Sequence, residues 1–413
     1  MSAAATCRGC GGGELAPFLD LGSAPPSNRY LTERSLGEPE PWLPLRVVLC
    51  AACGFAQTVD APQPESLFDG NYVYLSGCSQ SWRTHVEAYA AAVAARYDLG
   101  PDCFAIEIAA NDGTLLERLH ARGWDTLGIE PTAVPAALAR GRGLAVIERF
   151  FDVELAREIV REHGRAHLVV ANNVLAHVPD PYAFACGVRE LLLPAGVATF
   201  EFPHLLNLVE GLQFDTVYHE HYAYLNLGAV RRLFERAGLV VFDVETLSTH
   251  GGSLRVHAGR ADGLPRAIDA AVARQIVAED ASVWLRPGSA AKFQTRVEGV
   301  KDVFLAALLH AKASGQRVAA YGAAAKGNTL LNFAGVRTDL LRMVADRNPE
   351  KVGKWLPGSR IPIVDEAALH RFEPDLVVLL PWNLRDELEQ QLAGVRAWGG
   401  RLAVAVPTWT VLS

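Results

Sequence analysis

The stretch "CFAIEIAANDGTLLERLHARGWDTLGIEP", residues 103–131, contains a strand, a turn, a helix and a second strand. Its first eight residues form a short apolar run with a single charge, which is typical of a strand buried on both faces. A polar turn follows, and then a segment with helically spaced leucines that ends at a glycine. A strand–helix–strand unit of this length predicts a parallel sheet.

The same alternation extends in both directions along the chain. A helix is expected at 81–100, and three further strands alternate with three helices between residues 132 and 203. A helix at 229–238 then leads to strands at 239–247 and 253–259, which are close enough to pair. We therefore predict an α/β fold whose central parallel sheet is covered by helices on both faces.

The chain divides into three predicted domains, as its length of 413 residues favours. Residues 1–75 are rich in Pro, Gly and Cys and contain short strand-like runs. Residues 76–262 hold the alternating unit described above. Residues 263–413 begin with a mainly helical linker and continue with a second α/β unit, which starts at "RVAAYGAAAKGNTLL".

Charge and hydropathy exclude several classes of partner. The net charge is -7 and no block of Lys or Arg stands out, so we expect no nucleic-acid partner. The first residues lack the basic and apolar regions of a signal peptide, and the longest apolar runs are too short to cross a membrane. We expect a cytoplasmic protein whose seven cysteines are reduced.

Two C-x-x-C-G motifs predict a metal site. Cys7 and Cys10 form the first pair, and Cys50 and Cys53 form the second. Two such turns supply the four soft ligands of a tetrahedral zinc ion, and four thiolates leave no open position for catalysis. The alternatives are two disulfides or chance spacing. Without a secretory signal, the spacing favours structural Zn²⁺.

The turn at residues 109–113 is a candidate cofactor site. Backbone N–H groups between a strand and a helix can face a bound ligand. A dinucleotide fingerprint needs three glycines, and only Gly113 is present. Glu107 inside the strand favours a methyltransferase-type turn, whose ligand is zwitterionic and carries no phosphate. The predicted contacts are Glu107, Ala109, Asn111, Asp112 and Gly113.

Two further strand ends carry polar side chains to the same edge of the sheet. Glu130 ends the next strand, where a carboxylate can accept both ribose hydroxyls of a nucleoside; the alternative is a solvated strand end. Asn172 and Asn173 end a later strand and are expected to bond the same cofactor. His177 either faces this crevice or caps the next helix, and the residues leave both interpretations open.

With these segments placed, the chain resembles the sugar C-methyltransferases of deoxysugar biosynthesis, which use S-adenosylmethionine and act on dTDP-linked 4-ketohexoses. The matching segments run nearly end to end: "CRGCG", "CAACGFAQT", "YVYLSGCSQSWRTH", "EIAANDGTLLE", "NNVLAHVPD", "FDTVYHEHYAYL", "THGGSLRV" and "YGAAAKGNTLLN". The resemblance implies a small zinc-binding N-terminal domain, a central class I methyltransferase domain of Rossmann-like topology and a C-terminal Rossmann-like α/β domain. It also implies S-adenosylmethionine and structural Zn²⁺ as cofactors, and a dTDP-4-keto-deoxysugar as the substrate.

The segment "FDTVYHEHYAYL", residues 214–225, carries the residue types that methylation of a ring carbon needs. A base must remove the proton beside the ketone, and the enolate must be stabilised. Following the resemblance, we predict that His221 takes the C-3 proton and that Glu220 orients it or acts as an alternate base. Tyr218 is predicted to donate to the enolate oxygen. Tyr72 and His177 are predicted to support this pocket, and His219 and Tyr222 to contact the substrate.

Two other interpretations of this segment stay open. In a strand, His219 and His221 would face the same side and could share a metal ion, although no complementary ligand follows at a familiar spacing. Alternatively, the segment is a polar strand end with satisfied histidines.

The second α/β unit is a candidate anion site. Lys326 and Asn328 lie near the predicted helix N-terminus after the strand "RVAAY", where they could bind the diphosphate or thymidine of a sugar nucleotide. The alternative is a turn whose small residues serve packing. Lys351, Trp382 and Asn383 end later strands and are weaker candidates. The glycines of "HGGS", residues 250–253, allow a close approach to the ligand or serve only the turn.

The predicted function is transfer of a methyl group from S-adenosylmethionine to C-3 of a dTDP-linked 4-keto-deoxyhexose, in deoxysugar or antibiotic biosynthesis. An O- or N-methyltransferase acting on a sugar or polyketide is the nearest alternative. A nicotinamide oxidoreductase would need the missing glycine fingerprint, and a zinc-bearing binding protein would lack the cofactor. We expect a monomer or weak homo-oligomer; the sequence does not specify which ketosugar is used or which face is methylated.

Overall fold

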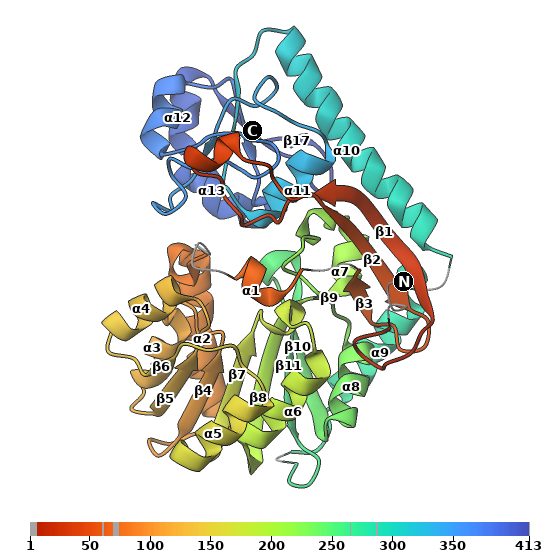
Figure 1. The fold of residues 1–413 in the computed structure, drawn as a ribbon, viewed down its shortest axis with the longest axis vertical. Helices are drawn as coiled ribbons and strands as arrows, with labels where there is room; N and C mark the ends of the chain where they lie inside the picture. The colour runs from red at the N-terminus through yellow and green to blue at the C-terminus, as the bar shows by residue number, and fades with distance from the viewer. Residues whose placement is uncertain (1–5, 60–61, 69–73, 265, 286–287, 413) are drawn as a thin grey trace.

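The fold is known from a computed structural model that describes residues 6–59, 62–68, 74–264, 266–285 and 288–412. The predicted site residue Tyr72 lies outside these residues. Figure 1 shows the C-terminal lobe above the methyltransferase-like lobe, with a long N-terminal hairpin along one side. The predicted α/β class is confirmed, because both lobes are built on mostly parallel sheets.

The central sheet has the strand order β10-β11-β8-β7-β4-β5-β6 in the described part of the chain. Its strands are β4 (Phe104–Ile108), β5 (Asp125–Ile129), β6 (Val146–Ile147), β7 (Ala166–Asn172), β8 (Leu192–Pro203), β10 (Leu239–Leu247) and β11 (Ser253–Arg260). The five strands from β6 to β8 pair in parallel, whereas β11 pairs antiparallel with both β8 and β10. The predicted pairing of the last two strands is therefore confirmed, and every residue of β4 is buried as its apolar run indicates.

Helices cover this sheet where the sequence predicts them. They are α2 (Gln80–Tyr97), α3 (Thr114–His120), α4 (Ala133–Gly141), α5 (Val153–His163), α6 (Pro181–Leu191) and α8 (Leu227–Arg236). A further short helix that the sequence did not predict, α7 (Leu205–Glu210), follows β8. Several begin at side-chain caps, as when Asp152 accepts a hydrogen bond from the Leu155 amide and Asn226 from the Ala229 amide. These caps satisfy amides that the first helical turn leaves unpaired.

The N-terminal sheet is completed by a strand from far along the chain. Its order is β1 (Leu15–Ala24), β2 (Leu43–Cys50), β3 (Ala56–Thr58) and β9 (Ala223–Tyr224). The short helix α1 (Pro64–Leu67) comes after β3 in the chain. Strand β9 directly follows the "YHEH" residues and pairs antiparallel with β3. Because the second domain supplies this strand, the N-terminal sheet and the candidate catalytic segment form one structure. The predicted domain boundaries remain predictions.

The C-terminal lobe follows two helices, α9 (Ala270–Ala281) and α10 (Ala290–Ala313), which confirm the helical linker. Its sheet has the order β14 (Ile363–Val364), β13 (Val344–Ala345), β12 (Val318–Tyr321), β15 (Leu376–Leu379), β16 (Arg401–Val404) and β17 (Thr410–Val411). Its helices are α11 (Ala325–Phe333), α12 (Glu366–Phe372) and α13 (Arg385–Gln391). All pairs are parallel except β16 with β17.

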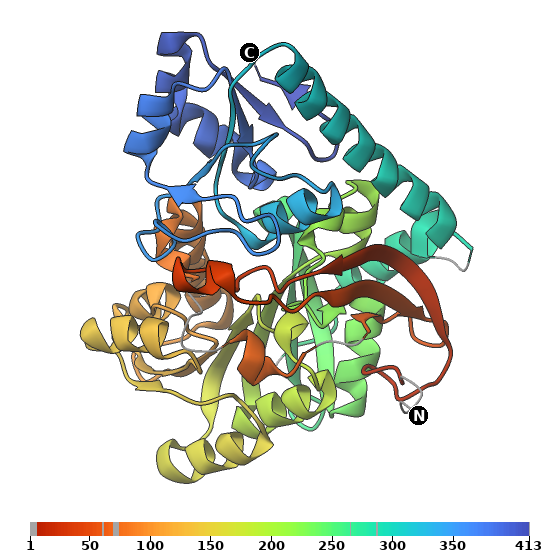
Figure 2. The same cartoon turned by 45° about the horizontal axis from the view of Figure 1, so that its top comes forward.

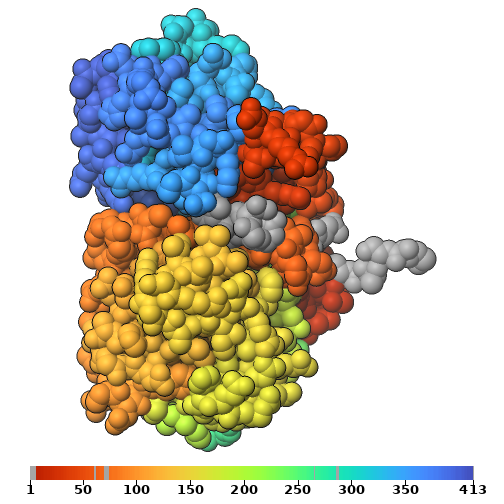
Figure 3. Space-filling view, turned by 60° about the vertical axis from the view of Figure 1, so that its left-hand side comes forward, coloured from red at the N-terminus to blue at the C-terminus, as the bar shows by residue number. Residues whose placement is uncertain are grey.

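A shared core joins the N-terminal hairpin to the C-terminal lobe. Figure 2 shows strands β1 and β2 running along the long helix α10. One buried cluster contains Phe18 of β1, Phe293 of α10 and Val318 of β12, and the two phenylalanine rings stack with centroids 5.4 Å apart. Figure 3 shows the two lobes in contact with each other, with the N-terminal segments beside them. In the described residues, we find no helix that has both the length and the apolar character to cross a membrane.

Candidate active site and zinc centre

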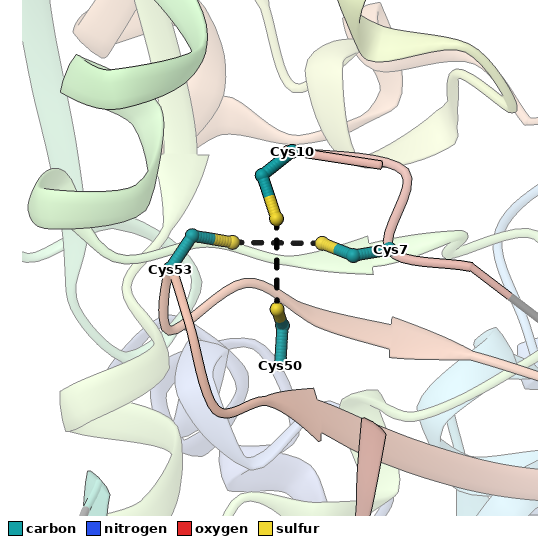
Figure 4. A group of neighbouring side chains, drawn as sticks. All are labelled: Cys7, Cys10, Cys50 and Cys53. Atoms are coloured by element: carbon teal, nitrogen blue, oxygen red, sulfur yellow. Dashed lines mark hydrogen bonds between the residues drawn. The ribbon is translucent and has the colours of Figure 1, made fainter. Parts of the chain in front are cut away.

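The four predicted cysteine ligands come together at the edge of the N-terminal sheet. Cys7, Cys10, Cys50 and Cys53 place their sulfur atoms within 4.8 Å of one another, and Figure 4 shows all four pointing at one centre. The Sγ atoms of Cys7 and Cys53 are 3.5 Å apart, close to the roughly 3.8 Å that a tetrahedron of Zn–S bonds requires. No disulfide joins these cysteines, so the disulfide interpretation is wrong. The set is a four-cysteine zinc site.

Local backbone geometry builds the two zinc knuckles, which we define as Cys7–Cys10 and Cys50–Cys53. The amides of Gly11 and Gly54 donate to the carbonyls of Cys7 and Cys50, at 2.7 and 2.9 Å. Both glycines have left-handed φ angles, 80° and 72°, which other residues adopt only with strain. The Arg232 side chain of α8 donates to the Cys53 carbonyl, so the zinc site also attaches the N-terminal sheet to the central domain.

A cavity of about 340 Å³ lies where all three parts of the chain meet. Four groups of residues line it, and none of the cysteine ligands is among them. The sheet-edge wall comprises Ile108, Ala109, Asn111, Ile129, Glu130, Thr132, Asn172 and Asn173, and the histidine cluster comprises His177, Tyr218, His221 and His250. The N-terminal part contributes Asn28, and the C-terminal lobe contributes Lys326 and Lys351. The zinc is therefore separate from the cavity, as four thiolate ligands predict.

The turn after β4 faces the cavity with a strained backbone. Ala109 and Asn111 both have positive φ angles, 60° and 50°. Asn111 accepts a hydrogen bond from the Ser76 amide at 2.9 Å, and Asp112 accepts one from the Ser76 hydroxyl at 2.8 Å. Asp112 and Gly113 do not line the cavity. They shape the turn instead, since a Cβ at Gly113 would come 2.6 Å from Leu144 Cδ1.

Glu130 lies on the sheet-edge wall, as expected for a carboxylate that contacts ribose. Its Oε2 accepts from the Asn111 amide at 2.9 Å and its Oε1 from the Thr132 amide at 2.8 Å. Oε1 also accepts from the Thr132 hydroxyl, so Oε2 is the oxygen that keeps a free lone pair for a ligand hydroxyl. Glu107, in contrast, does not line the cavity; burial and nearby Asp112 raise its pKa well above the usual range.

Asn172 has an unsatisfied amide in the cavity wall. Both its Oδ1 and Nδ2 are buried without a hydrogen-bond partner in the described structure. Buried amides normally find partners, so this group fits a polar ligand. Asn173 has a left-handed φ of 54°, and its amide donates to the Glu201 carbonyl at 2.7 Å.

His177 and His221 are fixed in the same tautomer by backbone carbonyls. The His221 Nδ1 lies 2.9 Å from the Thr216 carbonyl and the His177 Nδ1 lies 2.7 Å from the Glu220 carbonyl. A carbonyl oxygen only accepts, so each Nδ1 carries the proton and each neutral ring leaves Nε2 as an acceptor. The two ring centroids are 4.6 Å apart, and the Tyr218 ring lies 4.0 Å from that of His221.

Burial keeps both imidazoles neutral at pH 7. It lowers the pKa of His177 to about 4. It also lowers the pKa of His221 well below its usual range, and the neighbouring His177 adds to this shift. Both residues therefore present an unprotonated Nε2. Of the two interpretations left open for His177, the structure supports the crevice position, since His177 lines the cavity.

His219 and Glu220 of the "YHEH" segment, and Tyr222 after it, do not line the cavity. His219 Nε2 donates toward the Pro44 carbonyl at 3.2 Å, Glu220 accepts from the Asn28 amide at 2.9 Å, and the Tyr222 hydroxyl donates to the Pro62 carbonyl at 2.6 Å. The segment is a turn rather than a strand, so His219 and His221 diverge. The shared-metal interpretation is therefore wrong, and the cysteine set is the one metal-binding cluster found in the described residues.

The C-terminal lobe brings two lysines to the cavity. Lys326 Nζ donates to Asn383 Oδ1 at 2.6 Å and lies 4.6 Å from the Trp382 ring centroid. Burial lowers the pKa of Lys326 to about 8, and Asp215 partly opposes this shift. Lys351 Nζ donates to the Ala323 carbonyl at 2.9 Å. Asn328 is buried behind this wall, and neither of its amide atoms has a partner in the described structure.

Sequence reasoning did not select Asn28, Trp82 or His250 as lining residues. Asn28 and Trp82 come from segments that lack a strand–turn–helix pattern, so their position depends on tertiary packing. His250 precedes the two glycines of "HGGS". A polar residue directly before such a turn is the sequence signal that could have indicated His250 as a lining residue.

Comparisons with known proteins agree with this arrangement. Residues 7–68 match a family described as a zinc binding domain, residues 92–244 a methyltransferase domain, and residues 248–407 a C-methyltransferase C-terminal domain. The chain is 34% identical to C-methyltransferase NovU of Streptomyces niveus over 98% of its own length and 96% of that protein.

Two other similar proteins match a smaller part of the chain. A ubiquinone biosynthesis O-methyltransferase of Pectobacterium carotovorum is 29% identical over 23% of this chain and 41% of that protein. The crystal structure of magnesium protoporphyrin IX methyltransferase (ChlM) from Synechocystis PCC 6803 with bound SAM is similar with a TM-score of 0.33 and 16% identity, over 43% of this chain and 79% of that one. The full-length match thus distinguishes NovU from these proteins.

Proposed function

Because the chain belongs to the family of S-adenosylmethionine-dependent C-methyltransferases that includes NovU, we propose that it methylates C-3 of a dTDP-linked 4-keto-deoxyhexose in deoxysugar or antibiotic biosynthesis. The observation that supports this proposal most is the histidine cluster, in which two neutral imidazoles present Nε2 acceptors next to a tyrosine. A carbon acceptor needs a base together with a group that stabilises an enolate, whereas a hydroxyl acceptor needs only a base.

His221 is the proposed base. Its Nε2 takes the C-3 proton. The electrons of the C–H bond form a double bond between C-3 and C-4 of the sugar, so that negative charge develops on the ketone oxygen. C-3 then attacks the methyl carbon as the methyl–sulfur bond breaks toward sulfur. The Thr216 carbonyl holds Nδ1–H throughout, so the proton arrives at a defined nitrogen.

The neighbours of His221 have supporting roles in this proposal. Tyr218 donates to the enolate oxygen, and its ring packs on that of His221. Glu220 positions the cluster in two ways: its carbonyl accepts from His177 Nδ1, and its carboxylate accepts from the Asn28 amide. This carboxylate lies outside the cavity lining, which favours orientation over an alternate base. The roles of Tyr72, His219 and Tyr222 remain predictions.

The sheet-edge wall is the proposed cofactor site. When bound, S-adenosylmethionine supplies a methyl group that its sulfonium charge makes electrophilic. Glu130 would accept a ribose hydroxyl through the free lone pair of Oε2, while Oε1 is held by the amide and hydroxyl of Thr132. Asn172 would satisfy its buried amide on the polar part of the cofactor. The contacts predicted for Glu107, Asp112 and Gly113 would then be indirect, through the shape of the turn.

The two lysines are the proposed site for the diphosphate of the sugar nucleotide. Lys326 and Lys351 line the cavity from the C-terminal lobe, and Lys326 lies at the start of α11, whose free amides also favour an anion. Asn328 lies two residues further along the helix and is buried with its amide unsatisfied. We propose that it adjusts toward the nucleotide rather than serving packing alone.

Exchange of the C-3 hydrogen tests this function. The enzyme is incubated with a panel of dTDP-4-keto sugars in deuterium oxide, with and without S-adenosylmethionine, and mass spectrometry follows exchange and methyl transfer. We expect deuterium at C-3 without the cofactor and a methyl group at C-3 with it. Methylation of a hydroxyl or amine without exchange would indicate the O- or N-methyltransferase alternative. A wild-type enzyme inactive on every sugar would contradict the proposal.

A further inference from the structure

His250 has a backbone conformation that its residue type adopts only under constraint. It lies in the turn between β10 and β11, within the 3-10 segment Thr249–Gly251, with φ 55° and ψ 21°. For a residue with a Cβ, this left-handed conformation is strained. Glycine would occupy it without this strain, and the histidine instead places an imidazole at this turn.

Contacts from two directions hold this turn in place. On the methyltransferase side, the Gln213 amide group donates to the Gly251 carbonyl at 2.7 Å. On the C-terminal side, a Cβ at Gly251 would lie 2.5 Å from the Trp382 ring. Gly252 has a φ of 114°, and a Cβ there would overlap Asn207 of α7. The turn therefore cannot move without disturbing both lobes.

These contacts place His250 in the same part of the molecule as the base and the lysine of the proposed mechanism. Gln213 belongs to the segment that leads into His221, and the Trp382 ring that packs on the turn also carries Lys326 at 4.6 Å. The strand after the turn begins opposite Pro203, a cavity residue at the end of β8. The His250 side chain thus lines the same cavity as His221 and Lys326.

The imidazole of His250 makes a ring contact but no hydrogen bond within the described structure. Its centroid lies 5.9 Å from that of Trp82, which fixes the ring plane and leaves the nitrogens available to a ligand. Burial, with a contribution from Lys326, lowers the pKa of His250 to about 4. The neutral ring offers one N–H donor in a site with little water, where a donor to a developing oxyanion is most effective.

We propose that His250 is a further catalytic residue, whose N–H donates a hydrogen bond to the ketone oxygen of the acceptor as the C-3 proton leaves. It would act together with Tyr218, which lines the same cavity. This inference rests on the proposed function, because an oxyanion forms only if the acceptor is a ketone.

Two variants that suit a left-handed backbone test the inference without unfolding the turn. H250G removes the ring, and H250N keeps a shorter donor. We expect H250G to lower both kcat and the rate of C-3 exchange by about 100-fold or more, the usual effect of removing one oxyanion donor. H250N should lose less. The affinity for S-adenosylmethionine, measured by calorimetry, should change less than about twofold, since the ring does not belong to the sheet-edge wall.

The matched control is Glu373→Gly, at an exposed position with a φ of 46° after α12. It relieves the same kind of backbone strain far from the cavity and should leave both rates unchanged. H250G with near wild-type kcat and exchange would overturn the inference, as would a loss confined to cofactor affinity. A wild-type enzyme inactive on all ketosugars would overturn the proposed function and this inference together; an active wild type with an equally active H250G overturns this inference alone.

Discussion

The zinc knuckles and the "YHEH" segment are both short polar motifs, yet their side chains behave oppositely. In the knuckles, four cysteines converge on one point. In the segment 218–221, His221 enters the cavity, His219 turns to the Pro44 carbonyl and Glu220 turns to the Asn28 amide. Each knuckle is closed by its own hydrogen bonds, whereas the partners of His219 and Glu220 lie 175 and 192 residues away.

This difference shows when a motif predicts its own geometry. A C-x-x-C-G turn contains the contacts that aim its thiolates, so spacing alone indicates a metal site. The direction of each side chain in "YHEH" depends on where the N-terminal sheet packs. The two regions are also coupled, because β9 follows His221 and completes the sheet that carries the zinc ligands.

Removing the zinc should have the largest effect and would test this coupling. Zinc binding contributes about 10 kcal/mol or more in small zinc domains, so Cys53→Ser or chelation should unfold the N-terminal sheet. Because β9 would lose its partner strand, we expect methyl transfer to fall by more than about 100-fold as well. Zinc content, thermal unfolding and activity are measured on one sample.

The exposed Cys78 is not a ligand and serves as the control. Cys78→Ser should retain zinc, unfolding temperature and activity. If a zinc-free Cys53→Ser protein kept the wild-type activity, the two regions would be independent.

Replacing His221 should remove the chemistry and leave the fold intact. His221→Asn loses the Nε2 acceptor, so C-3 exchange should slow by about 1,000-fold, within the range of general-base catalysis. The zinc content and the affinity for S-adenosylmethionine should not change, because His221 contacts neither site. Exposed His163 on α5 provides a matched histidine-to-asparagine control. Near wild-type exchange by His221→Asn would remove the base assignment.

Lys326 should make substrate binding depend on pH in the alkaline range. The pKa of its ammonium group is about 8, so the positive charge is present below pH 8 and is lost as the pH rises through 8. For an anionic substrate, we expect KM to increase by up to about tenfold per pH unit above 8.

In Lys326→Met, KM should be high at neutral pH and should no longer rise in this range. Steady-state kinetics between pH 6 and 10 compare the two enzymes. A wild-type KM that is independent of pH would argue against anion binding by Lys326.

The smallest effect is expected at His219, which sharpens the contrast within one segment. His219→Phe keeps the ring shape and removes the donor to the Leu43 and Pro44 carbonyls. The free energy of unfolding should fall by about 1–3 kcal/mol, the effect of leaving a buried polar group unsatisfied. The kcat should remain within about twofold of wild type, because a side chain outside the cavity makes no contact with the reacting groups in the transition state. A large loss of kcat in a stably folded His219→Phe protein would show that His219 contacts the substrate.

Sequence patterns predicted most of the fold because the deciding signals are local. The apolar run at 104–108, the turn at 109–113 and the strand that ends before Glu130 are each indicated by residues that are close together in the sequence. The structure contains all three. The ligand contacts of the turn at 109–113 do not follow from its residue types. Asp112 and Gly113 have the residue types of a ligand site, but they support the neighbouring segments, because the strained backbone at Ala109 and Asn111 forms the wall.

The sequence by itself determined the zinc site, the alternating strands and helices of the central domain, the strand and helix that begin the C-terminal α/β unit, and the presence of a base-rich segment at 214–225. Only the tertiary structure decided which nitrogen of His177 and His221 is free, that β9 joins the N-terminal sheet, and that His250 faces the cavity. The physical reason is the range of the contacts. Spacing and periodicity record interactions across one turn or one strand, whereas a carbonyl that selects a tautomer, or a tryptophan that packs against a turn, is brought there by segments distant in sequence.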